Sequence, residues 1–202
     1  MTTATAASAD SADGVVLCGG RGRRADGVDK GLLPVAGSRA VDIALAQLRP
    51  LCEQLYINAN RNINEYAERG DATVFGDLRA GYPGPLAALE AAAQLPLAPL
   101  VLLLPVDMPL LAPAIPAALL QHMRRADAAT DVVSASDGER IHYLCACVRS
   151  HCLRGAATVL DAGEHRVRAW LDNLRHETLE FQGEAAASLR NINSAAAWAE
   201  LR

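Results

Sequence analysis

The chain has 202 residues, of which 51% are hydrophobic but only 4% aromatic, and its formal net charge is -4. This length fits one domain, whose core must be assembled from closely packed Ala, Leu and Val, as in layered α/β proteins. The negative charge argues against general binding to nucleic acids or anionic membranes. The most apolar run, residues 95–104, contains two prolines and is far shorter than the ~20 residues of a membrane-spanning helix.

The N-terminal segment and the cysteines give evidence about the cellular location of the protein. Residues 1–13 are small or polar and lack apolar periodicity, which predicts a disordered tail before a single domain at 14–202. The tail has neither the basic region nor the apolar region of a secretion signal. Five cysteines is an odd number, which does not indicate a disulfide framework. We therefore expect a cytoplasmic protein.

The rest of the chain alternates between strand and helix patterns, which predicts a three-layer α/β/α fold with a mostly parallel, Rossmann-like sheet. Ser38 is the expected N-cap of the first helix, and Pro85 the expected first residue of the second. After a first strand that begins at Val15, we expect strands at 54–58, 73–75, 100–104, 131–134 and 144–148, an edge strand at 178–181, and helices at 39–49, 85–94, 114–124, 151–162 and 194–201.

A loop rich in glycine and arginine follows the first strand. Its glycines permit positive φ, so successive N–H groups can converge on an anion. Its cations repel one another by ~4 kcal/mol at roughly 4 Å in an effective dielectric of about 20, and a bound polyphosphate would relieve that repulsion. A solvated basic loop is the alternative interpretation. The residues are Gly19, Gly20, Gly22, Gly27, Arg21, Arg23, Arg24 and Lys30.

Two common phosphate-binding motifs do not fit this loop. The spacing Gly20-x-Gly22-x-x-Ala25 matches the dinucleotide fingerprint, but no helix is expected at the turn, and the second strand ends in Asn58 rather than an acid. A P-loop requires Ser or Thr directly after its lysine, and Lys30 is followed by Gly31. The loop therefore indicates another class of phosphate-binding protein.

Polar residues follow three of the expected strands. Asn58 ends the second strand, Asp77 follows the third, and Asp107 lies beyond Pro105 at the end of the strand at 100–104. Open α/β sheets bind ligands at the carboxyl ends of their strands. Because Mg²⁺ is held by few carboxylates, Asp107 is a candidate metal ligand. Turn or helix-cap roles remain alternatives for all three residues.

The sequence Leu17-Cys18-Gly19-Gly20-x-x-x-Arg24, followed by Asp29-Lys30-Gly31-Leu32, resembles the signature loop of nucleotidyltransferases that act on sugar phosphates. Within that group it is most similar to the molybdenum cofactor guanylyltransferase family, which joins GMP to molybdopterin. The resemblance covers nearly the whole chain and includes Ile57-Asn58-Ala59-Asn60-Arg61, Asp77, Tyr82-Pro83-Gly84-Pro85-Leu86, Pro105-x-Asp107-x-Pro109 and Asn191-x-Asn193.

This resemblance implies a fold of the nucleotide-diphospho-sugar transferase type and specific residue roles. The catalytic residues would be Arg24, Lys30 and Asp107, with Mg²⁺ on Asp107. The nucleotide-binding residues would be Leu17, Cys18, Gly19, Gly20, Lys30, Asn58, Asp77 and Asp107. The acceptor would contact Arg166, Asn191 and Asn193, although a solvated Arg166 and a helix-capping Asn193 are the alternatives from the residues themselves.

The sequence departs from the family pattern at three places, which leaves the fine shape of the pocket open. Cys18 stands where Ala is usual, Ala25-Asp26 where Met-Gly is usual, and His142-Tyr143 where His-Pro is usual. A group of His and Cys residues contains no Cys-x-x-Cys pair, which favours buried cysteines over a zinc site. This group is His142, Cys145, Cys147, His151 and Cys152.

The expected partners are GTP and molybdopterin or its molybdenum form, with transient contacts to cofactor-synthesis enzymes or acceptor molybdoenzymes. We expect a monomer that binds neither nucleic acid nor membrane. Two other functions fit the same loop. One is a cytidylyltransferase acting on molybdopterin or another phosphorylated acceptor, since only the base pocket need differ. The other is a non-catalytic nucleotide-binding or cofactor-binding protein, against which the metal-ligand candidate Asp107 argues.

Overall fold

Seven strands form the main sheet, with the order β5-β4-β1-β6-β8-β7-β9, in the computed structural model, which describes residues 8–19, 28–69, 71–81 and 83–201. Neighbouring strands from β5 to β6 are parallel, β8 runs antiparallel to β6 and β7, and β9 is parallel to β7. The strands are β1 (Ala12–Leu17), β4 (Leu55–Asn58), β5 (Thr73–Phe75), β6 (Leu100–Pro105), β7 (Val132–Ser136), β8 (Ile141–Arg149) and β9 (His176–Glu180).

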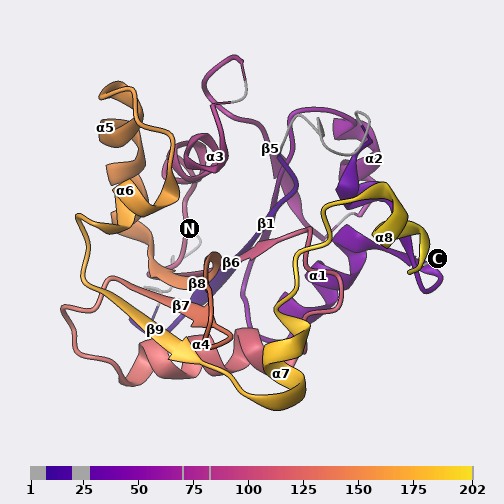
Figure 1. Cartoon of the computed structure of the whole chain (residues 1–202). Coiled ribbons are helices and arrows are strands. Elements are labelled where there is room, and N and C mark those ends of the chain that lie inside the picture. The colour runs from indigo at the N-terminus through magenta and orange to yellow at the C-terminus, as the bar shows by residue number, and fades with distance from the viewer. Residues whose placement is uncertain (1–7, 20–27, 70, 82, 202) are drawn as a thin grey trace, which may run out of the picture.

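Helices cover both faces of this sheet (Figure 1). One hydrophobic core lies between the sheet and α1 (Ala40–Leu48) and α4 (Ala114–Arg125). A second core packs α3 (Pro85–Ala92), α5 (Gly155–Asp161) and α6 (Val167–Leu171) against the opposite face. The expected three-layer α/β/α architecture with a mostly parallel sheet is therefore confirmed.

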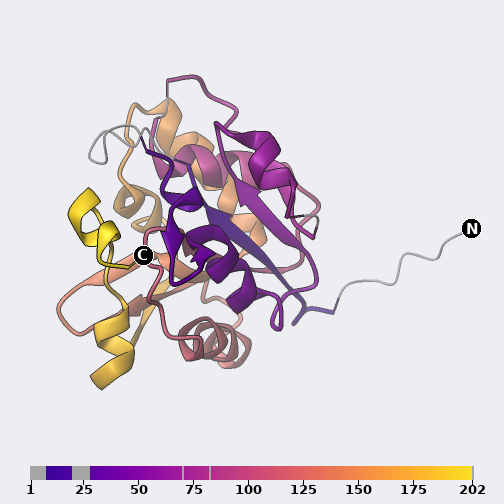
Figure 2. The same ribbon diagram turned by 90° about the vertical axis from the view of Figure 1, so that its right-hand side faces the viewer.

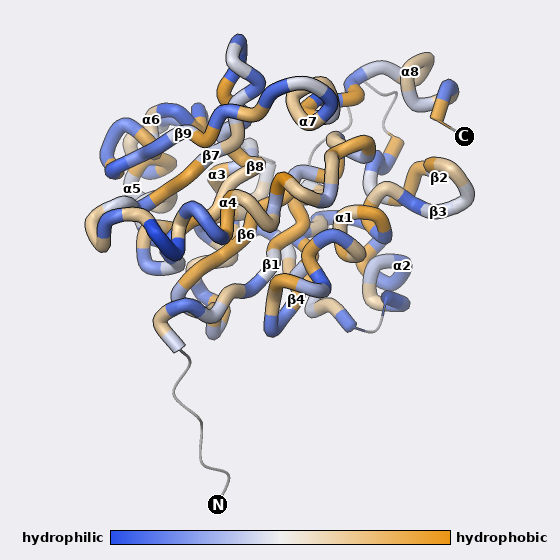
Figure 3. The backbone as a smooth tube through the Cα atoms, turned by 90° about the horizontal axis from the view of Figure 1, so that it is seen from below, coloured by the Kyte–Doolittle hydropathy of each residue, from blue (hydrophilic) through white to orange (hydrophobic). Residues whose placement is uncertain are grey.

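The central strands hold these layers together because they are apolar on both faces. Side chains of β6 alternate between the two cores, with Leu102 in one and Leu103 in the other, and both are fully buried. Each such leucine contributes about 1.5–3 kcal/mol when removed from water. Figure 3 shows β1 and β6 as hydrophobic segments through the middle of the molecule. The aromatic-poor composition is therefore compatible with two closely packed interfaces.

The first strand begins earlier than expected. Ala12 and Asp13, assigned to the tail in the sequence analysis, belong to β1. The Asp13 side chain is buried, and its two carboxylate oxygens accept hydrogen bonds from the backbone N–H groups of Gln54 and Ala98 at 2.9 and 2.8 Å. This polar segment can join the buried sheet because the Asp13 carboxylate accepts hydrogen bonds from two backbone N–H groups. Residues 1–7 lie outside the described part of the chain.

Several short elements were missed, and some boundaries were wrong. Ser38 lies in a strand, and the N-cap of α1 is Arg39 without a side-chain bond, so the expected Ser38 cap is wrong. The helix expected at 151–162 is instead η3 (Ser150–Arg154) followed by α5. Elements too short to show apolar periodicity were not predicted: η2 (Lys30–Leu32), β2 (Pro34–Val35), β3 (Ser38–Arg39), α2 (Ile63–Ala67), α6 and α7 (Gly183–Ser188).

Two helix starts follow the sequence rules. Pro85 is in the first turn of α3, as expected, and Gly84 before it has φ +99°. Ser194 caps α8 (Ala195–Ala199), accepting a hydrogen bond from the Ala197 N–H at 3.2 Å.

Across the described residues, no helix combines the length and apolarity needed to cross a membrane.

Candidate functional site

The carboxyl ends of β1, β4, β5 and β6 meet at one edge of the sheet. Gly19, Asn58, Asp77 and Asp107 all lie at or just beyond these ends. The parallel register, which pairs Leu17 with both Asn58 and Pro105, brings them to the same level. The N-terminus of α3 follows the same edge, where its dipole favours an anion or the polar edge of a base.

A hydrogen-bonded network fixes Asp77. One carboxylate oxygen accepts from Asn58 Nδ2 at 3.0 Å, and the other accepts from Asn60 Nδ2 at 2.8 Å. Asn60 Oδ1 in turn accepts from the Asp77 backbone N–H at 2.8 Å. The two amides therefore hold the carboxylate in one orientation. Asn60 was quoted within the family motif, but no role was predicted for it.

Gly19 and Asn58 fit together closely. Asn58 is 1% exposed, and its side-chain Oδ1 has no hydrogen-bond partner among the described residues. A Cβ on Gly19 would lie 2.5 Å from that oxygen, which is too close for any side chain. Glycine is therefore required here for steric reasons. Buried polar atoms are normally paired, so the unpaired Oδ1 is an exception at this edge of the sheet.

The backbone of the glycine loop is only partly available to a ligand. The Cys18 N–H donates to Asn58 O at 3.0 Å, which continues the sheet ladder by one residue. The Cys18 amide is therefore already bonded within the sheet, and a role for Cys18 in lining the nucleotide site stays a prediction. Leu17 O is likewise bonded, to the Val106 N–H at 3.2 Å. Gly20 and Arg24 lie outside the described residues.

Lys30 and Asp107 meet the C-terminal segment. The Lys30 Nζ donates to Ile192 O at 3.0 Å and to Asn193 Oδ1 at 2.9 Å, and it lies 3.6 Å from Asp107 Oδ2. Asn191 Nδ2 donates to Asp107 Oδ1 at 2.8 Å. Four residues predicted to act on different substrates thus form one cluster. Figure 2 shows the end of the chain, in yellow, at one side of the molecule.

The buried carboxylate of Asp29 fixes the backbone next to Lys30. Asp29 Oδ1 accepts from the Tyr66 hydroxyl at 2.6 Å and from the Gly31 N–H at 3.2 Å, and Oδ2 accepts from Asn62 Nδ2 at 3.0 Å. A Cβ on Gly31 would lie 2.3 Å from the Tyr66 hydroxyl oxygen. Burial raises the pKa of Tyr66 above its ordinary value, so this hydroxyl stays protonated and donates. The network fixes the backbone on both sides of Lys30.

We expect Tyr66→Phe to lower the free energy of unfolding by about 1–3 kcal/mol, because it removes a donor from a buried carboxylate. Denaturation by urea measures this change. Tyr56→Phe is the matched control: Tyr56 is also buried, but its hydroxyl makes no hydrogen bond with a described residue, so we expect a change below about 1 kcal/mol. Equal losses in the two variants would contradict the assigned role of Asp29.

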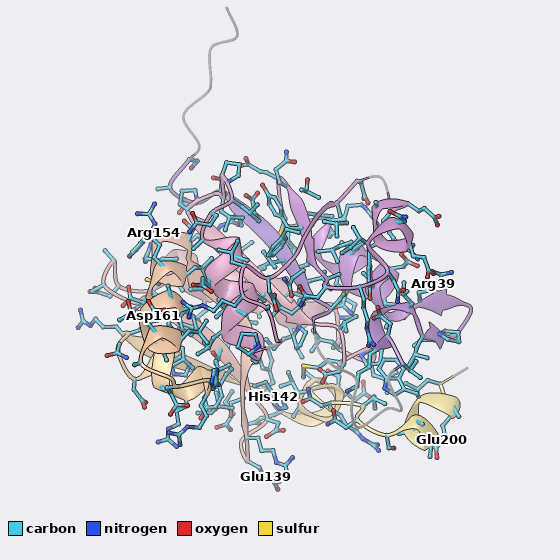
Figure 4. The ribbon with its side chains drawn as sticks, turned by 90° about the horizontal axis from the view of Figure 1, so that it is seen from above. Arg39, Glu139, His142, Arg154, Asp161 and Glu200 are labelled. Atoms are coloured by element: carbon cyan, nitrogen blue, oxygen red, sulfur yellow. The ribbon has the colours of Figure 1, made fainter. Side chains whose placement is uncertain are left out.

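A pocket of about 730 Å³ opens beside Asp107. Its walls are the end of β6, the hairpin between β7 and β8, and the segment from α7 to Asn193. This volume is within the range of small-molecule sites. Figure 4 shows Glu139 at the tip of the hairpin and His142 closer to the body of the molecule. Lining residues include Asp107, Asp137, Arg140, Tyr143, Arg190 and Asn191.

The hairpin wall is ordered by an acid–imidazole contact. His142 Nε2 lies 3.0 Å from Asp137 Oδ2, and the Arg140 N–H donates to Asp137 Oδ1 at 2.7 Å. The hydrogen bond to His142 is the main cause that lowers the pKa of Asp137 to about 2, and the backbone hydrogen bond from Arg140 adds to the effect. His142 and Tyr143, where the family pattern differs, therefore lie in the pocket wall rather than in the Lys30 cluster.

Arg166 differs from the other acceptor candidates in its contacts. Its guanidinium pairs with Glu164, its side chain is 81% exposed, and it does not line the pocket, whereas its neighbour Val167 does. The hydrogen bond to Arg166 is the main cause that lowers the pKa of Glu164 to about 2. A role for Arg166 in acceptor binding stays a prediction.

The donors around Asp107 suit a hard cation. Its carboxylate is partly exposed, and the neighbouring side chains of Asn191 and Asn193 provide amide oxygens. Mg²⁺ prefers oxygen ligands and keeps several waters, so one carboxylate supplemented by substrate phosphates is sufficient. Lys30 now lies beside this carboxylate, and its movement toward an incoming phosphate would leave Asp107 Oδ2 available.

Comparison with known proteins identifies the family. Residues 14–179 match the model of the MobA-like NTP transferase domain. The chain is 37% identical over 207 residues to a molybdenum cofactor guanylyltransferase from Burkholderia ambifaria, with 98% of this chain and 97% of the relative covered. It is 34% identical over 182 residues to a protein of the same name from Shewanella pealeana, with 90% and 89% covered.

Solved structures share the fold. Molybdopterin-guanine dinucleotide biosynthesis protein A from Archaeoglobus fulgidus superposes with a TM-score of 0.75 at 19% identity, covering 94% of this chain and 96% of the other. A 2-C-methyl-D-erythritol 4-phosphate cytidylyltransferase from Thermus thermophilus superposes with a TM-score of 0.66 at 15% identity, covering 93% and 95%. The expected fold of the nucleotide-diphospho-sugar transferase type is confirmed.

Proposed function

Because the chain belongs to the MobA-like NTP transferase family and to the molybdenum cofactor guanylyltransferases within it, we propose that it transfers GMP from GTP to molybdopterin and releases pyrophosphate. The observation that carries this proposal is the cluster of Lys30, Asp107, Asn191 and Asn193 beside a pocket large enough for an acceptor. The product would be the molybdopterin guanine dinucleotide.

The reaction is a single in-line displacement. A phosphate oxygen of the acceptor attacks the α-phosphorus of GTP, the bond from that phosphorus to the β-phosphate oxygen breaks, and pyrophosphate leaves with the bonding electrons. Since the nucleophile is already an anion, no general base is needed. Catalysis then depends on positioning and charge neutralisation. This agrees with the absence of a nucleophile–base pair from the described part of the cluster.

Lys30, Asp107 and Asn191 each have a role in this scheme. Lys30 exchanges its contacts with Ile192 O and Asn193 for the β- and γ-phosphates, and Arg24 joins it there. Asp107 would hold Mg²⁺, and Asn191 keeps its carboxylate in position. When bound, Mg²⁺ neutralises the charge that develops around the α-phosphate. Asn58 and Asp77 bind the nucleotide, with Asn60 positioning Asp77.

The acceptor occupies the pocket beside Asp107. Arg140 on the hairpin and Arg190 next to Asn191 both line it. Asp107, Asp137 and Glu139 line the same pocket, so the phosphate of the acceptor is assigned to the side of these two arginines. We further propose that the chain from the start of β1 at Ala12 works as one domain with GTP and Mg²⁺, in the cytoplasm and as a monomer, and that its contacts with cofactor-synthesis enzymes and acceptor molybdoenzymes are transient.

Magnesium-dependent pyrophosphate release tests this function. We expect release from GTP only when molybdopterin or its molybdenum form is present. ATP and CTP serve as the base controls under the same conditions. Release from CTP alone would keep the mechanism but assign the chain to cytidylyl transfer. No release from any of the three nucleotides, with tight GTP binding, would favour the non-catalytic binding protein and contradict the proposal.

A further inference from the structure

We propose that Asp131, His151 and Cys152 form a zinc-binding site at the end of the sheet opposite to the GTP site. Asp131 directly precedes β7, and the other two residues lie in η3 directly after β8. The antiparallel pairing of β7 with β8 brings these segments together, since the Arg149 N–H donates to Asp131 O at 2.9 Å. Asp107, in contrast, follows the other end of β6.

The three donor atoms have the spacing of zinc ligands. Cys152 Sγ lies 3.3 Å from Asp131 Oδ1 and 3.3 Å from His151 Nε2, and that nitrogen lies 4.0 Å from Oδ1. Around a tetrahedral zinc ion with Zn–S of about 2.3 Å and Zn–N or Zn–O of about 2.0–2.1 Å, neighbouring ligand atoms are about 3.3–3.6 Å apart. The triangle is therefore close to one face of a coordination tetrahedron.

The surroundings orient the donors without occupying them. The other oxygen of Asp131, Oδ2, accepts from the Arg175 N–H at 3.0 Å, and no Lys or Arg in the described ranges pairs with this carboxylate. The nearby Arg149 side chain donates to Thr130 O at 2.8 Å instead. Trp170 Nε1 donates to Cys152 O at 3.1 Å, which anchors η3 to α6.

The donor types select the metal. Thiolate sulfur and imidazole nitrogen favour Zn²⁺, whereas Mg²⁺ prefers oxygen ligands only. The His151 side chain is 70% exposed, so its ring can rotate toward the ion, and a water can take the fourth position. On binding, the Cys152 sulfur forms a bond with the ion and its proton leaves to solvent. The ion would tie the start of β7 to η3.

Cobalt(II) is the probe that tests this site, because it replaces zinc and reports its ligands by absorption. We expect the wild-type protein to show a thiolate-to-cobalt charge-transfer band together with visible bands typical of tetrahedral cobalt. The Asp107 cluster contains no sulfur, so it cannot produce the charge-transfer band. Cys152→Ser should abolish that band, and added Zn²⁺ should displace it.

His151→Asn is the variant least able to disturb folding, because the side chain is mostly exposed. We expect it to weaken cobalt binding at least about tenfold. His165→Asn removes another exposed histidine and should leave binding unchanged. At 100 times its Kd for the wild type, Zn²⁺ should raise the Tm of the wild type by roughly 5–10 °C and that of His151→Asn by about half as much or less.

Two results would overturn the site. One is a wild-type protein that shows no charge-transfer band up to millimolar Co²⁺. The other is a band of equal strength and affinity in His151→Asn. GTP turnover should be the same in His151→Asn and wild type, since the cluster lies at the opposite end of the sheet. Failure of the zinc site would therefore leave the proposed transferase function untouched.

Discussion

Replacing Asp107 with Ala is expected to lower kcat by at least about 10²-fold while leaving the fold intact. The carboxylate lies at the sheet edge, partly exposed, with one oxygen bonded to Asn191 and the other 3.6 Å from Lys30. Its removal takes away the charged oxygen proposed to hold Mg²⁺ against the α-phosphate. Lys30 keeps its bonds to Ile192 O and Asn193, so the C-terminal segment should remain attached.

The kinetics and the fold are measured separately. Pyrophosphate release at saturating GTP and acceptor gives kcat, and thermal unfolding gives Tm. Asp71→Ala is the control, because it removes another partly exposed carboxylate that pairs with Arg49 far from the cluster. We expect wild-type kcat in that variant. Full activity of Asp107→Ala would remove Asp107 as the metal ligand.

Lys30→Ala is expected to raise the KM for GTP by about tenfold or more and to lower kcat as well. The ammonium group is the only described cation that contacts both Asp107 and the C-terminal segment. A lysine that binds phosphates in the ground state and in the transition state affects both constants. Lys30→Arg, which keeps the charge, should recover part of the loss. Kinetics of Lys30→Ala equal to wild type would place the lysine outside the reaction.

A chemical experiment tests the same residue in the unmodified protein. Lys30 is the only lysine in the chain, so an amine-selective reagent can modify only this side chain and the N-terminal amine. We expect saturating GTP with Mg²⁺ to slow modification of Lys30, but not of the N-terminus. Equal protection by pyrophosphate would indicate that the phosphates rather than the base are responsible. Modification at the same rate with and without GTP would contradict the proposed contact.

The sequence predicts the strand ends well, because each is marked by a local change of residue type. The apolar run at 100–104 stops at Pro105, which lies at the last position of β6, and the Asp107 candidate therefore falls at the correct edge. Asn58 is likewise the last residue of β4. These placements need only the alternation of strands and helices, which puts carboxyl ends of parallel strands together.

The contacts between distant segments could not be predicted from the residues alone. Lys30 lies 162 residues before its acceptor Ile192 O, and no local pattern links them. The family resemblance named Lys30, Asn191 and Asn193 but not their mutual contact. Tyr66 orders the backbone at Lys30, but in the sequence it is a single aromatic residue in a polar stretch and gives no sign of that contact. Asn60 had a signal in the sequence, since it follows Asn58 by two residues at a strand end.

The cluster of Asp131, His151 and Cys152 illustrates the same limit. His151 and Cys152 were considered with the cysteines of β8, whose Cys145 and Cys147 are fully buried, as expected. The ligand candidate that the sequence did not suggest was Asp131. It lies near His151 and Cys152 only because β7 and β8 pair in antiparallel register. Sequence spacing reports neighbours along the chain, whereas ligand sets depend on neighbours across a sheet.

The most direct test of the account is to follow the α-phosphate of GTP. The protein is incubated with Mg²⁺, molybdopterin and GTP labelled at the α-phosphate, and the products are separated and identified by mass. We predict that the label appears in a dinucleotide made of the acceptor and GMP, with one pyrophosphate released for each dinucleotide formed. Label that remains in GTP or appears only in free GMP, with no dinucleotide, would contradict the claim that this chain is a guanylyltransferase.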